Sequence, residues 1–355
     1  MSNDFVVFDG HNDTLLNLYQ SERGFGRNFF ERSTPEKGHI DLPRAKESGF
    51  GGGIFAIFCP SQAKANTFDN YKTANGYALP TPPPLDRSSA VETVMDMMAL
   101  LFRLERESEG AIKVTRTVDE IEHCIQNDIL AMCLHFEGAE AIDTDFNALE
   151  VFYQAGLRSL GIVWSRPTAF AHGVPLRYPA DPDIGPGLTD AGKALVKACN
   201  DLGIMLDLSH LNEKGFWDVV NLSDAPIVAT HSNVHRLCNM PRNLTDKQLD
   251  AIKASNGMVG LNFAVGFLRE DGKWDANTPL ETMVRHIDYL VEHVGIDCVG
   301  FGSDYDGAKI PTEIADVTGL PKLIDALKQS GYDDDSLRKI THQNWLRVLR
   351  QTWKD

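Results

Sequence analysis

Short apolar runs that end in polar residues recur along the whole chain, and amphipathic stretches separate them. Each run is nearly continuous in hydrophobic residues, as is typical of a strand buried on both faces of a parallel sheet. Eight runs are recognised: FVVFDGHND (5–13), GFGGGIFAIF (49–58), ILAMCLHFEG (129–138), SLGIVW (159–164), LGIMLDLSH (202–210), PIVATHSN (226–233), GMVGLNFA (257–264) and CVGFGSDYDG (298–307). Eight strands alternating with helices predict a (β/α)8 barrel of the TIM type. A doubly wound open sheet is the alternative.

The segments between these runs carry helical signals. The main helical candidates span residues 88–110, 188–203, 244–257 and 278–295. Thr189 and Thr245 stand where an N-cap is expected, and all four segments end in glycine, which favours helix termination.

Two connections are much longer than the others. Residues 59–88 contain TPPPLD, and residues 165–187 read SRPTAFAHGVPLRYPADPDIGPG. Both follow predicted strands, so both belong at the carboxyl-terminal face of the barrel, where active sites of this fold lie. Long loops without regular structure are usually lids or binding loops. No linker interrupts the pattern, so we predict one barrel domain over residues 1–355.

The amino-acid composition excludes some classes of binding partner. Hydrophobic residues make up 43% of the 355 residues, enough for a large core, and the formal net charge is −16. An acidic surface repels phosphate backbones, so we expect no nucleic-acid partner. No apolar run approaches the roughly 20 residues of a membrane helix. The opening MSNDFVVF has neither a basic segment nor a cleavable apolar one, which predicts a cytoplasmic protein.

The six cysteines, Cys59, Cys124, Cys133, Cys199, Cys238 and Cys298, are scattered without a CxxC pair. This spacing disfavours both a disulfide framework and a thiolate zinc site. We expect buried, reduced thiols.

Polar residues with metal-binding chemistry stand at the ends of several predicted strands. They are His11 and Asp13 (first strand), Glu137 (third), His210 (fifth), His231 (sixth) and Asp304 (eighth). A lone histidine at a strand end is more often a hydrogen-bonded structural residue, and the HxD spacing alone is a weak signal. In a barrel, however, all these strand ends meet around one mouth.

The residue types predict a two-metal hydrolytic site. His11 and Asp13 are two apart, so they project from the same face of a strand and can hold one cation together. His210 and His231 can hold a second cation. Imidazole and carboxylate are suitable ligands for Zn²⁺ and related ions. Glu137 has two oxygens with which to bridge the ions, and Asp304 is placed to transfer a proton.

The chain resembles the renal or membrane dipeptidases, a metallopeptidase branch of the amidohydrolase superfamily. The segments that carry the resemblance are DGHND (9–13), FEG (136–138), DLSH (207–210), THSN (230–233), PRN (241–243), GSDYDG (302–307) and QNWLRVLR (343–350). They occur in the family's order and span essentially the whole chain.

The resemblance implies a distorted barrel with two zinc ions, although other divalent ions are compatible with the same ligands. His11 and Asp13 would bind one ion, His210 and His231 the other, and Glu137 both. A hydroxide bridging the ions would attack the peptide carbonyl, and Asp304 would pass the proton to the leaving amine. Arg242 would bind the carboxylate of the dipeptide, as a guanidinium fork suits that group. The resemblance also implies a homodimer.

One position departs from the family pattern. Better-known members have a histidine at the end of strand four, where Trp164 stands here. Tryptophan donates one hydrogen bond and takes up no proton. We interpret Trp164 as a substrate-contacting pocket wall; Arg166 or His172 in the next loop are alternative sources of the lost function. Asp9 shares the inward face of His11, and we expect it to orient a ligand.

The sequence therefore predicts a zinc-dependent dipeptidase acting on small dipeptides, including L-Xaa-D-Xaa. The alternative is a two-metal amidohydrolase for N-acyl amino acids or another small amide, motivated by Trp164. A third hypothesis is a metal-binding scaffold without catalysis. Asp304 and Arg242 argue against it, because metal storage needs neither residue.

Overall fold

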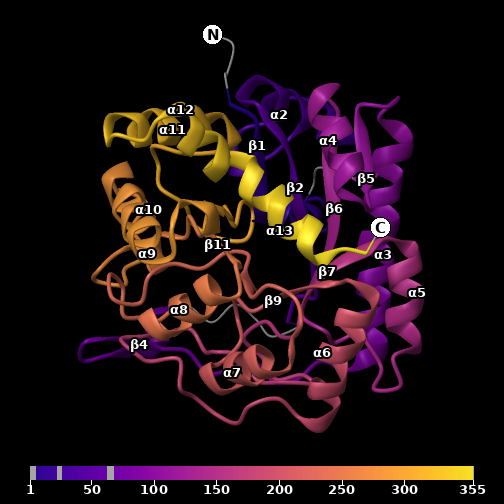
Figure 1. Ribbon diagram of the computed structural model, residues 1–355, viewed down its shortest axis with the longest axis vertical. Helices are drawn as coiled ribbons and strands as arrows, with labels where there is room; N and C mark the ends of the chain where they lie inside the picture. Colours follow the sequence, from indigo (N-terminus) through magenta and orange to yellow (C-terminus); the bar gives the residue numbers. More distant parts are fainter. Residues whose placement is uncertain (1–4, 22–25, 62–67, 355) are drawn as a thin grey trace.

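The computed structural model describes residues 5–21, 26–61 and 68–354, and its centre is a nearly closed barrel of eight parallel strands (Figure 1). The strands in spatial order are β1 (Val7–Asn12), β2 (Phe50–Phe58), β6 (Leu130–Glu137), β7 (Leu157–Gly161), β9 (Met205–Asp207), β10 (Val228–Ala229), β11 (Met258–Leu261) and β12 (Val299–Phe301). Seven of them lie within the predicted runs, and β7 begins two residues before its run of 159–164. The barrel prediction is confirmed, and the open sheet is excluded.

The barrel closes just beyond the end of β12. The amide of Asp304 donates to the carbonyl of His11 at 3.0 Å, and the amide of Asp13 donates to the carbonyl of Tyr305 at 2.7 Å. These backbone bonds hold the chain after β12 against the end of β1. Closure itself therefore brings a predicted metal ligand next to the predicted proton carrier.

One strand was not predicted. β5 (Ile112–Thr115) pairs with the first half of β6, from Leu130 to Cys133, and β7 pairs with the second half. Two strands thus share one edge of β6, which distorts the barrel at this point. β5 has four residues, two of which are polar or charged, and such a short run carries too weak a hydrophobic pattern to be recognised.

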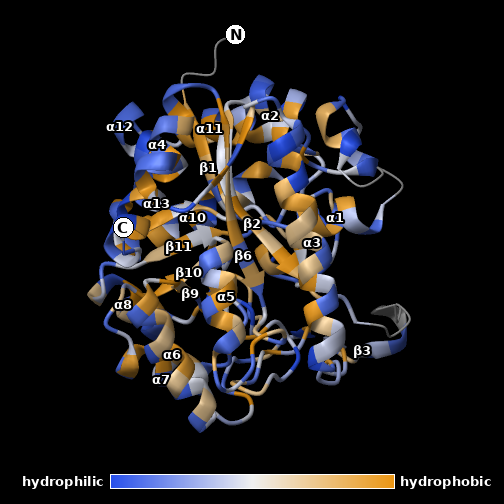
Figure 2. Ribbon diagram, turned by 90° about the vertical axis from the view of Figure 1, so that its right-hand side faces the viewer, coloured by the Kyte–Doolittle hydropathy of each residue, from blue (hydrophilic) through white to orange (hydrophobic). Residues whose placement is uncertain are grey.

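Helices cover the outside of the barrel (Figure 2). They are α1 (Thr14–Gln20), α2 (Leu42–Ser48), α3 (Arg87–Glu107), α4 (Val118–Gln126), α5 (Asn147–Ala155), α6 (Asp190–Leu202), α7 (Glu213–Leu222), α8 (Asp246–Ala254), α9 (Val265–Leu268), α10 (Leu280–Val294), α11 (Leu320–Gln329), α12 (Asp334–Arg338) and α13 (Asn344–Thr352). The hydroxyls of Thr189 and Thr245 cap α6 and α8 as predicted. The prediction that α8 runs to Gly257 was wrong: Ser255 is its C-cap, and Asn256 follows with a φ of 54°.

The carboxyl-terminal helix α13 crosses in front of the barrel strands and packs against β11 and β12 (Figure 1). Trp345 is fully buried, and its indole donates to the carbonyl of Phe301 at 2.9 Å. It belongs to one apolar cluster with residues of six barrel strands. A side chain at Gly10 would lie 2.2 Å from the Trp345 ring, so glycine is required there.

The two long connections pair with each other. β3 (Lys72–Thr73) and β4 (Gly76–Ala78) come from the first, and β8 (Arg177–Tyr178) comes from the second. Together they form a three-stranded antiparallel sheet in which Tyr77 lies opposite Tyr178. The expectation that both connections lack regular structure was wrong, because this pairing joins segments about a hundred residues apart and leaves no local pattern. Part of the first connection, residues 62–67, lies outside the described residues.

Candidate active site

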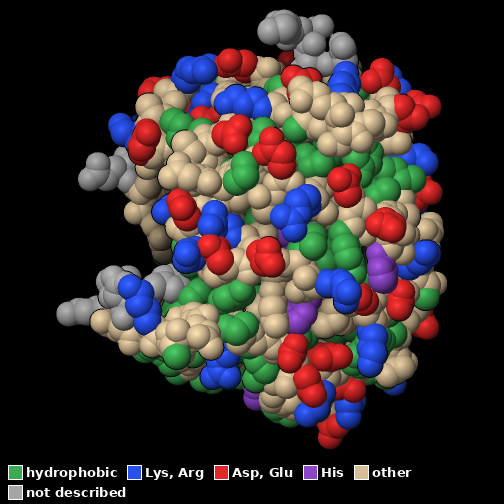
Figure 3. All heavy atoms as spheres, turned by 90° about the vertical axis from the view of Figure 1, so that its left-hand side faces the viewer, with side chains coloured by type: hydrophobic (Ala, Val, Ile, Leu, Met, Phe, Trp, Pro, Cys, Tyr) green, Lys and Arg blue, Asp and Glu red, His purple; other side chains and the backbone are tan. Residues whose placement is uncertain are grey.

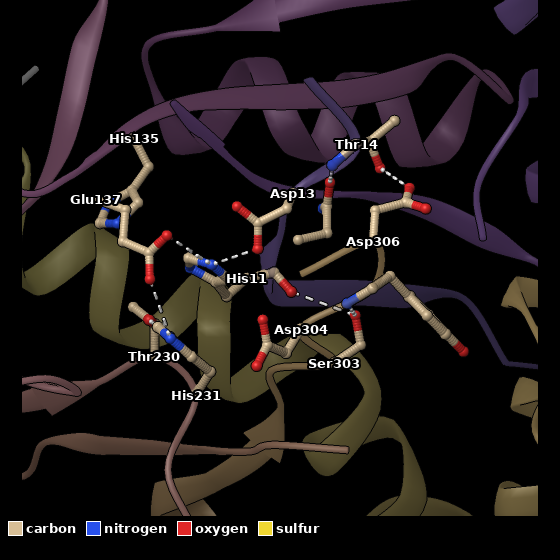
Figure 4. A network of polar contacts seen from close by, with 12 residues as sticks. His11, Asp13, Thr14, His135, Glu137, Thr230, His231, Ser303, Asp304 and Asp306 are labelled. Carbon is tan, nitrogen blue, oxygen red and sulfur yellow. Dashed lines mark hydrogen bonds and ion pairs between the residues drawn. The ribbon is translucent and has the colours of Figure 1, made fainter. Parts of the chain in front are cut away.

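The six residues singled out at strand ends lie together at the barrel mouth. Figure 4 labels five of them: His11, Asp13, Glu137, His231 and Asp304. His11 is the fifth residue of β1 and Glu137 is the last residue of β6, whereas the others stand in the first residues after their strands. They are all buried: His11, Asp13, Glu137, His210, His231 and Asp304 are each no more than 8% exposed. The structure thus brings together the complete predicted set of metal ligands and the predicted proton carrier.

Glu137 stands between two groups of donors. One of its oxygens lies 3.9 Å from Nε2 of His11, which in turn lies 3.4 Å from the Asp13 carboxylate. The other oxygen lies 2.9 Å from Nε2 of His210 and 3.7 Å from Nε2 of His231. Each group offers three ligand atoms within 4.8 Å of one another. Two sets that share one carboxylate are the arrangement expected of a two-metal site.

The donor atoms lack partners of their own, which is the test of whether a metal fits. Both ring nitrogens of His11 and one oxygen of Asp13 are buried without a hydrogen bond. Nε2 of His210 and Nε2 of His231 face each other at 3.1 Å, although two unprotonated nitrogens cannot bond to each other. Buried polar atoms without partners are costly. Cations between these atoms would satisfy them, so the residues fit the predicted metals.

The electrostatics of the cluster agree with this. Burial raises the pKa of Glu137 well above its usual value, and the Asp13 charge raises it further. Burial keeps the pKa of His210 and His231 well below the usual value, so both imidazoles are neutral, as ligands must be. Burial also opposes charge on His11, yet the carboxylates of Glu137 and Asp13 raise its pKa to about 10. The buried carboxylates therefore favour a positive charge at this place, which a bound cation would supply.

Asp304 is held by a residue that the sequence did not reveal. The side-chain amide of Asn262 donates to its carboxylate at 2.9 Å. Burial, followed by the charge of Asp13, raises the pKa of Asp304 above its usual value. A raised carboxyl pKa suits a group that takes up and releases a proton near neutral pH. Asn262 lies in the run 257–264, but an asparagine after a strand carries no distinctive signal.

Asp207, at the end of β9, is a second residue whose importance the sequence did not reveal. Its carboxylate accepts from both the amide and the hydroxyl of Ser209 and from both the amide and the hydroxyl of Thr230, at 2.6–3.0 Å. These bonds join the turns that carry His210 and His231. The pattern DLSH was recognised as part of the family resemblance, yet nothing local distinguishes the role of its aspartate.

Asp9 lies under the site, but its bonds differ from the expectation that it orients a ligand side chain. Its two carboxylate oxygens accept from the amide and the hydroxyl of Ser303, each at 2.7 Å. The Ser303 hydroxyl is also 3.2 Å from the carbonyl of His11. Asp9 therefore fixes the start of the turn that carries Asp304.

A pocket of about 140 Å³ opens above these residues. Its floor contains Asp13, Glu137, His210 and Asp304. Its walls are Leu16, Phe58, Trp164, Leu176, Phe267, Trp274, Gly307 and Ala308. Trp164 is thus in the wall, with its ring centre 6.1 Å from that of His210. Neither Arg166 nor His172, the alternatives to Trp164, is among the described residues that line this pocket.

Arg242 is buried beside the pocket, with its guanidinium 5.3 Å from the ring centre of Phe267. Nη1 donates to the Ser209 carbonyl and to the Ser232 hydroxyl, and Nη2 donates to the His231 carbonyl. These bonds use three of the five N–H groups of arginine. The Nε–H group has no partner among the described residues. Arg242 is not among the described residues that line the pocket, so its binding of a substrate carboxylate stays a prediction.

Comparison with known proteins identifies the family. A family model described as membrane dipeptidase, peptidase family M19, matches residues 1–354. The chain belongs to this family. The membrane dipeptidases are metallopeptidases, so the resemblance inferred from the strand-end motifs is confirmed. Among the described residues, no helix is both long and apolar enough to cross a membrane.

Three relatives show how close the match to this family is. The crystal structure of a metallopeptidase from Rhodobacter sphaeroides, liganded with a phosphinate mimic of the dipeptide L-Ala-D-Ala, is 51% identical. It has a TM-score of 0.95, and the match covers 98% of this chain and 99% of that one. A second solved structure, a dipeptidase of family M19, is 50% identical with a TM-score of 0.92 and the same coverage. An uncharacterised Klebsiella pneumoniae protein from the pqqA 5′ region is 47% identical over 264 residues, 74% of this chain and 97% of that protein.

Proposed function

We propose that this membrane dipeptidase family member hydrolyses the peptide bond of small dipeptides with two divalent ions, zinc in the first instance. The observation that carries the proposal is the pair of three-donor sets that share Glu137 on the floor of a small pocket. His11 and Asp13 would hold one ion, and His210 and His231 the other. When bound, two such ions lower the pKa of a shared water and polarise the attacked carbonyl.

The residues around the metals would handle the proton and the substrate. Asp304, oriented by Asn262, accepts the proton of the attacking water and delivers it to the leaving nitrogen when the C–N bond breaks. Arg242, whose Nε has no partner among the described residues, would bind the substrate carboxylate, and Trp164 forms part of the pocket wall. The Rhodobacter relative was crystallised with a mimic of L-Ala-D-Ala, which favours L-Xaa-D-Xaa substrates here.

A substrate panel combined with metal analysis tests this function. We expect about two zinc or other divalent ions per chain and turnover of dipeptides, including L-Ala-D-Ala. N-acyl amino acids are the competing class, since Trp164 replaces the family's histidine. Turnover of N-acyl amino acids without any dipeptide turnover would contradict the dipeptidase. A metal-loaded protein inactive on both classes would favour the scaffold. The homodimer and the cytoplasmic location predicted from the sequence stay predictions.

Asp304→Asn tests the proton carrier. Asparagine keeps the shape of the side chain but cannot take up a proton, so kcat should fall by about 10²–10⁴-fold. KM and metal content should change little, because the three-donor sets around Glu137 are intact. Steady-state kinetics and elemental analysis on the same preparation separate the two effects. Unchanged kcat with normal metal content would assign the proton transfer to another group.

A further inference from the structure

A buried ion pair lies directly behind the aromatic wall of the pocket. Arg166, in the loop after β7, is 0% exposed, and its Nε lies 3.2 Å from the carboxylate of Glu140, in the loop after β6. Its Nη2 donates to the carbonyl of Cys59 at 2.6 Å, directly after β2. Three neighbouring strand ends of the barrel are therefore joined by one guanidinium.

The guanidinium also packs on two rings of the wall. Its central carbon lies 5.2 Å from the ring centre of Phe58 and 5.3 Å from that of Trp164. The two rings meet each other edge to face at 5.0 Å. A cation over aromatic faces is attractive, and a planar guanidinium restrains rings more than a flexible chain would. The Arg166 guanidinium thus restrains Phe58 and Trp164 on the side away from the pocket.

The ion pair is not explained by stability alone. Burying two charges has a large desolvation cost, and apolar residues of similar volume often stabilise a fold equally well. The pair does not reach the reacting atoms either, since neither residue lines the pocket. The Arg166 side of the pair instead contacts Phe58 and Trp164 of the pocket wall.

The wall itself is suited to one class of side chain. Leu16, Phe58, Trp164, Leu176, Phe267 and Trp274 are large and apolar, and the described lining contains no lysine or arginine. A negatively charged substrate side chain placed against it would lose water without gaining an ion partner among the lining residues. An apolar one would gain buried area.

We propose that Arg166, paired with Glu140, is a positioning residue that holds Phe58 and Trp164 as a rigid wall, and that this wall makes the enzyme select dipeptides with an apolar side chain against it. The inference rests on the proposed dipeptidase activity and names the substrate class of that site.

The test measures a selectivity ratio. kcat/KM is determined for L-Leu-D-Ala and L-Phe-D-Ala against L-Asp-D-Ala, and for L-Ala-D-Leu against L-Ala-D-Asp, so that both positions are covered. The wild-type enzyme should prefer the apolar substrate by about tenfold or more at one position, the order expected of an apolar pocket. Trp164→Ala should remove most of that preference.

The decisive variant is Arg166→Met combined with Glu140→Leu, which replaces the pair by apolar residues that keep the interior filled. We expect a melting temperature near that of the wild type and a selectivity ratio that falls by about tenfold, since the rings lose their support. Arg166→Lys, which keeps the charge without the planar fork, should lower the ratio too and serves if the double variant does not fold.

Arg158→Met is the matched control. Arg158 also stacks on an aromatic ring, that of Tyr153 at 4.2 Å, and donates to backbone carbonyls, but it lies near the start of β7, away from the pocket. Its replacement should leave the ratio unchanged. A wild-type enzyme without apolar preference, or pair variants that keep the full ratio, would overturn the inference. Absence of turnover with every dipeptide would overturn the proposed function instead.

Discussion

Single residues decide how closely the carboxylates of the site approach one another. Asp13 and Asp304 both lie against the Cα of Gly307: a Cβ at that position would be 2.0 Å from an oxygen of Asp13 and 2.5 Å from an oxygen of Asp304. Real side chains do not approach so closely, so one or both carboxylates would have to move. Glycine at this position therefore belongs to the geometry of the site.

Gly307→Ala should lower metal content and reduce kcat/KM by about a hundredfold, because small displacements in an active site are costly. Gly161→Ala is the control, since its added Cβ would meet only atoms at 3.6 Å near the same end of the barrel. Elemental analysis and kinetics on both variants decide the question. Equal metal content and activity in the two would show that the carboxylates relax without consequence.

At the scale of elements, the turn after β12 is held in an unusual conformation from outside the barrel. Asp304 and Asp306 have positive φ values of 59° and 67°, which are sparsely populated for residues other than glycine. The amide of Asp306 donates to Nδ1 of His39 at 2.8 Å, and the amide of His39 donates to the Asp306 carboxylate at 2.7 Å. Thr14 adds a third bond.

His39→Ala should lower kcat by about 10- to 100-fold, because the turn that carries Asp304 loses an acceptor. His39→Asn should restore most of the activity, since its side-chain oxygen can accept the same amide. His342→Ala, a comparable half-buried histidine that contacts the carbonyl of Val6, should change stability without changing kcat. Loss of stability in His39→Ala with normal kcat would contradict a role in positioning Asp304.

For the whole molecule, the metals should contribute to stability as well as to activity. The proposed ligands come from four separate strand ends, so ions bound there join distant parts of the chain and favour the folded state. Dialysis against a strong chelator should abolish activity and lower the melting temperature by several degrees, and added zinc should reverse both changes. A chelated protein that keeps its melting temperature would show that the barrel is stable without the ions.

The pH dependence of stability should reflect a buried histidine that is not among the proposed metal ligands. His286 in α10 is buried; its Nδ1 accepts from the amide of Val234 and its Nε2 bonds to the Leu268 carbonyl. Burial lowers its pKa from 6.5 to about 4. The folded state thus resists protonation while the unfolded state accepts the proton, so stability is lost as the pH falls from about 6.5 towards 4.

At pH 5 this linkage amounts to about 2 kcal/mol. His286→Gln, which keeps a donor and an acceptor, should lose less stability than the wild type between pH 7.5 and pH 5. Urea unfolding at both pH values measures the difference, and metal loss affects both proteins alike. Parallel loss in the two proteins would assign the acid sensitivity to other groups.

On the face shown in Figure 3, acidic and basic side chains are interspersed. The net charge of −16 comes from an excess of aspartate and glutamate over the whole chain. Selectivity is therefore better sought in the pocket than on this face.

The sequence by itself determined the eight strands, four of the helices and the residues of the proposed metal site. Buried parallel strands are apolar runs, and a barrel places every strand end at one mouth, so His11, Glu137 and His231 could be brought together before any coordinates were known. Only the tertiary structure decided the rest. The bonds of Asp207 and Asn262, the pairing of the two long connections and the position of Arg166 behind Trp164 all join distant segments. Such contacts depend on side-chain geometry and leave no periodic signal in a single sequence.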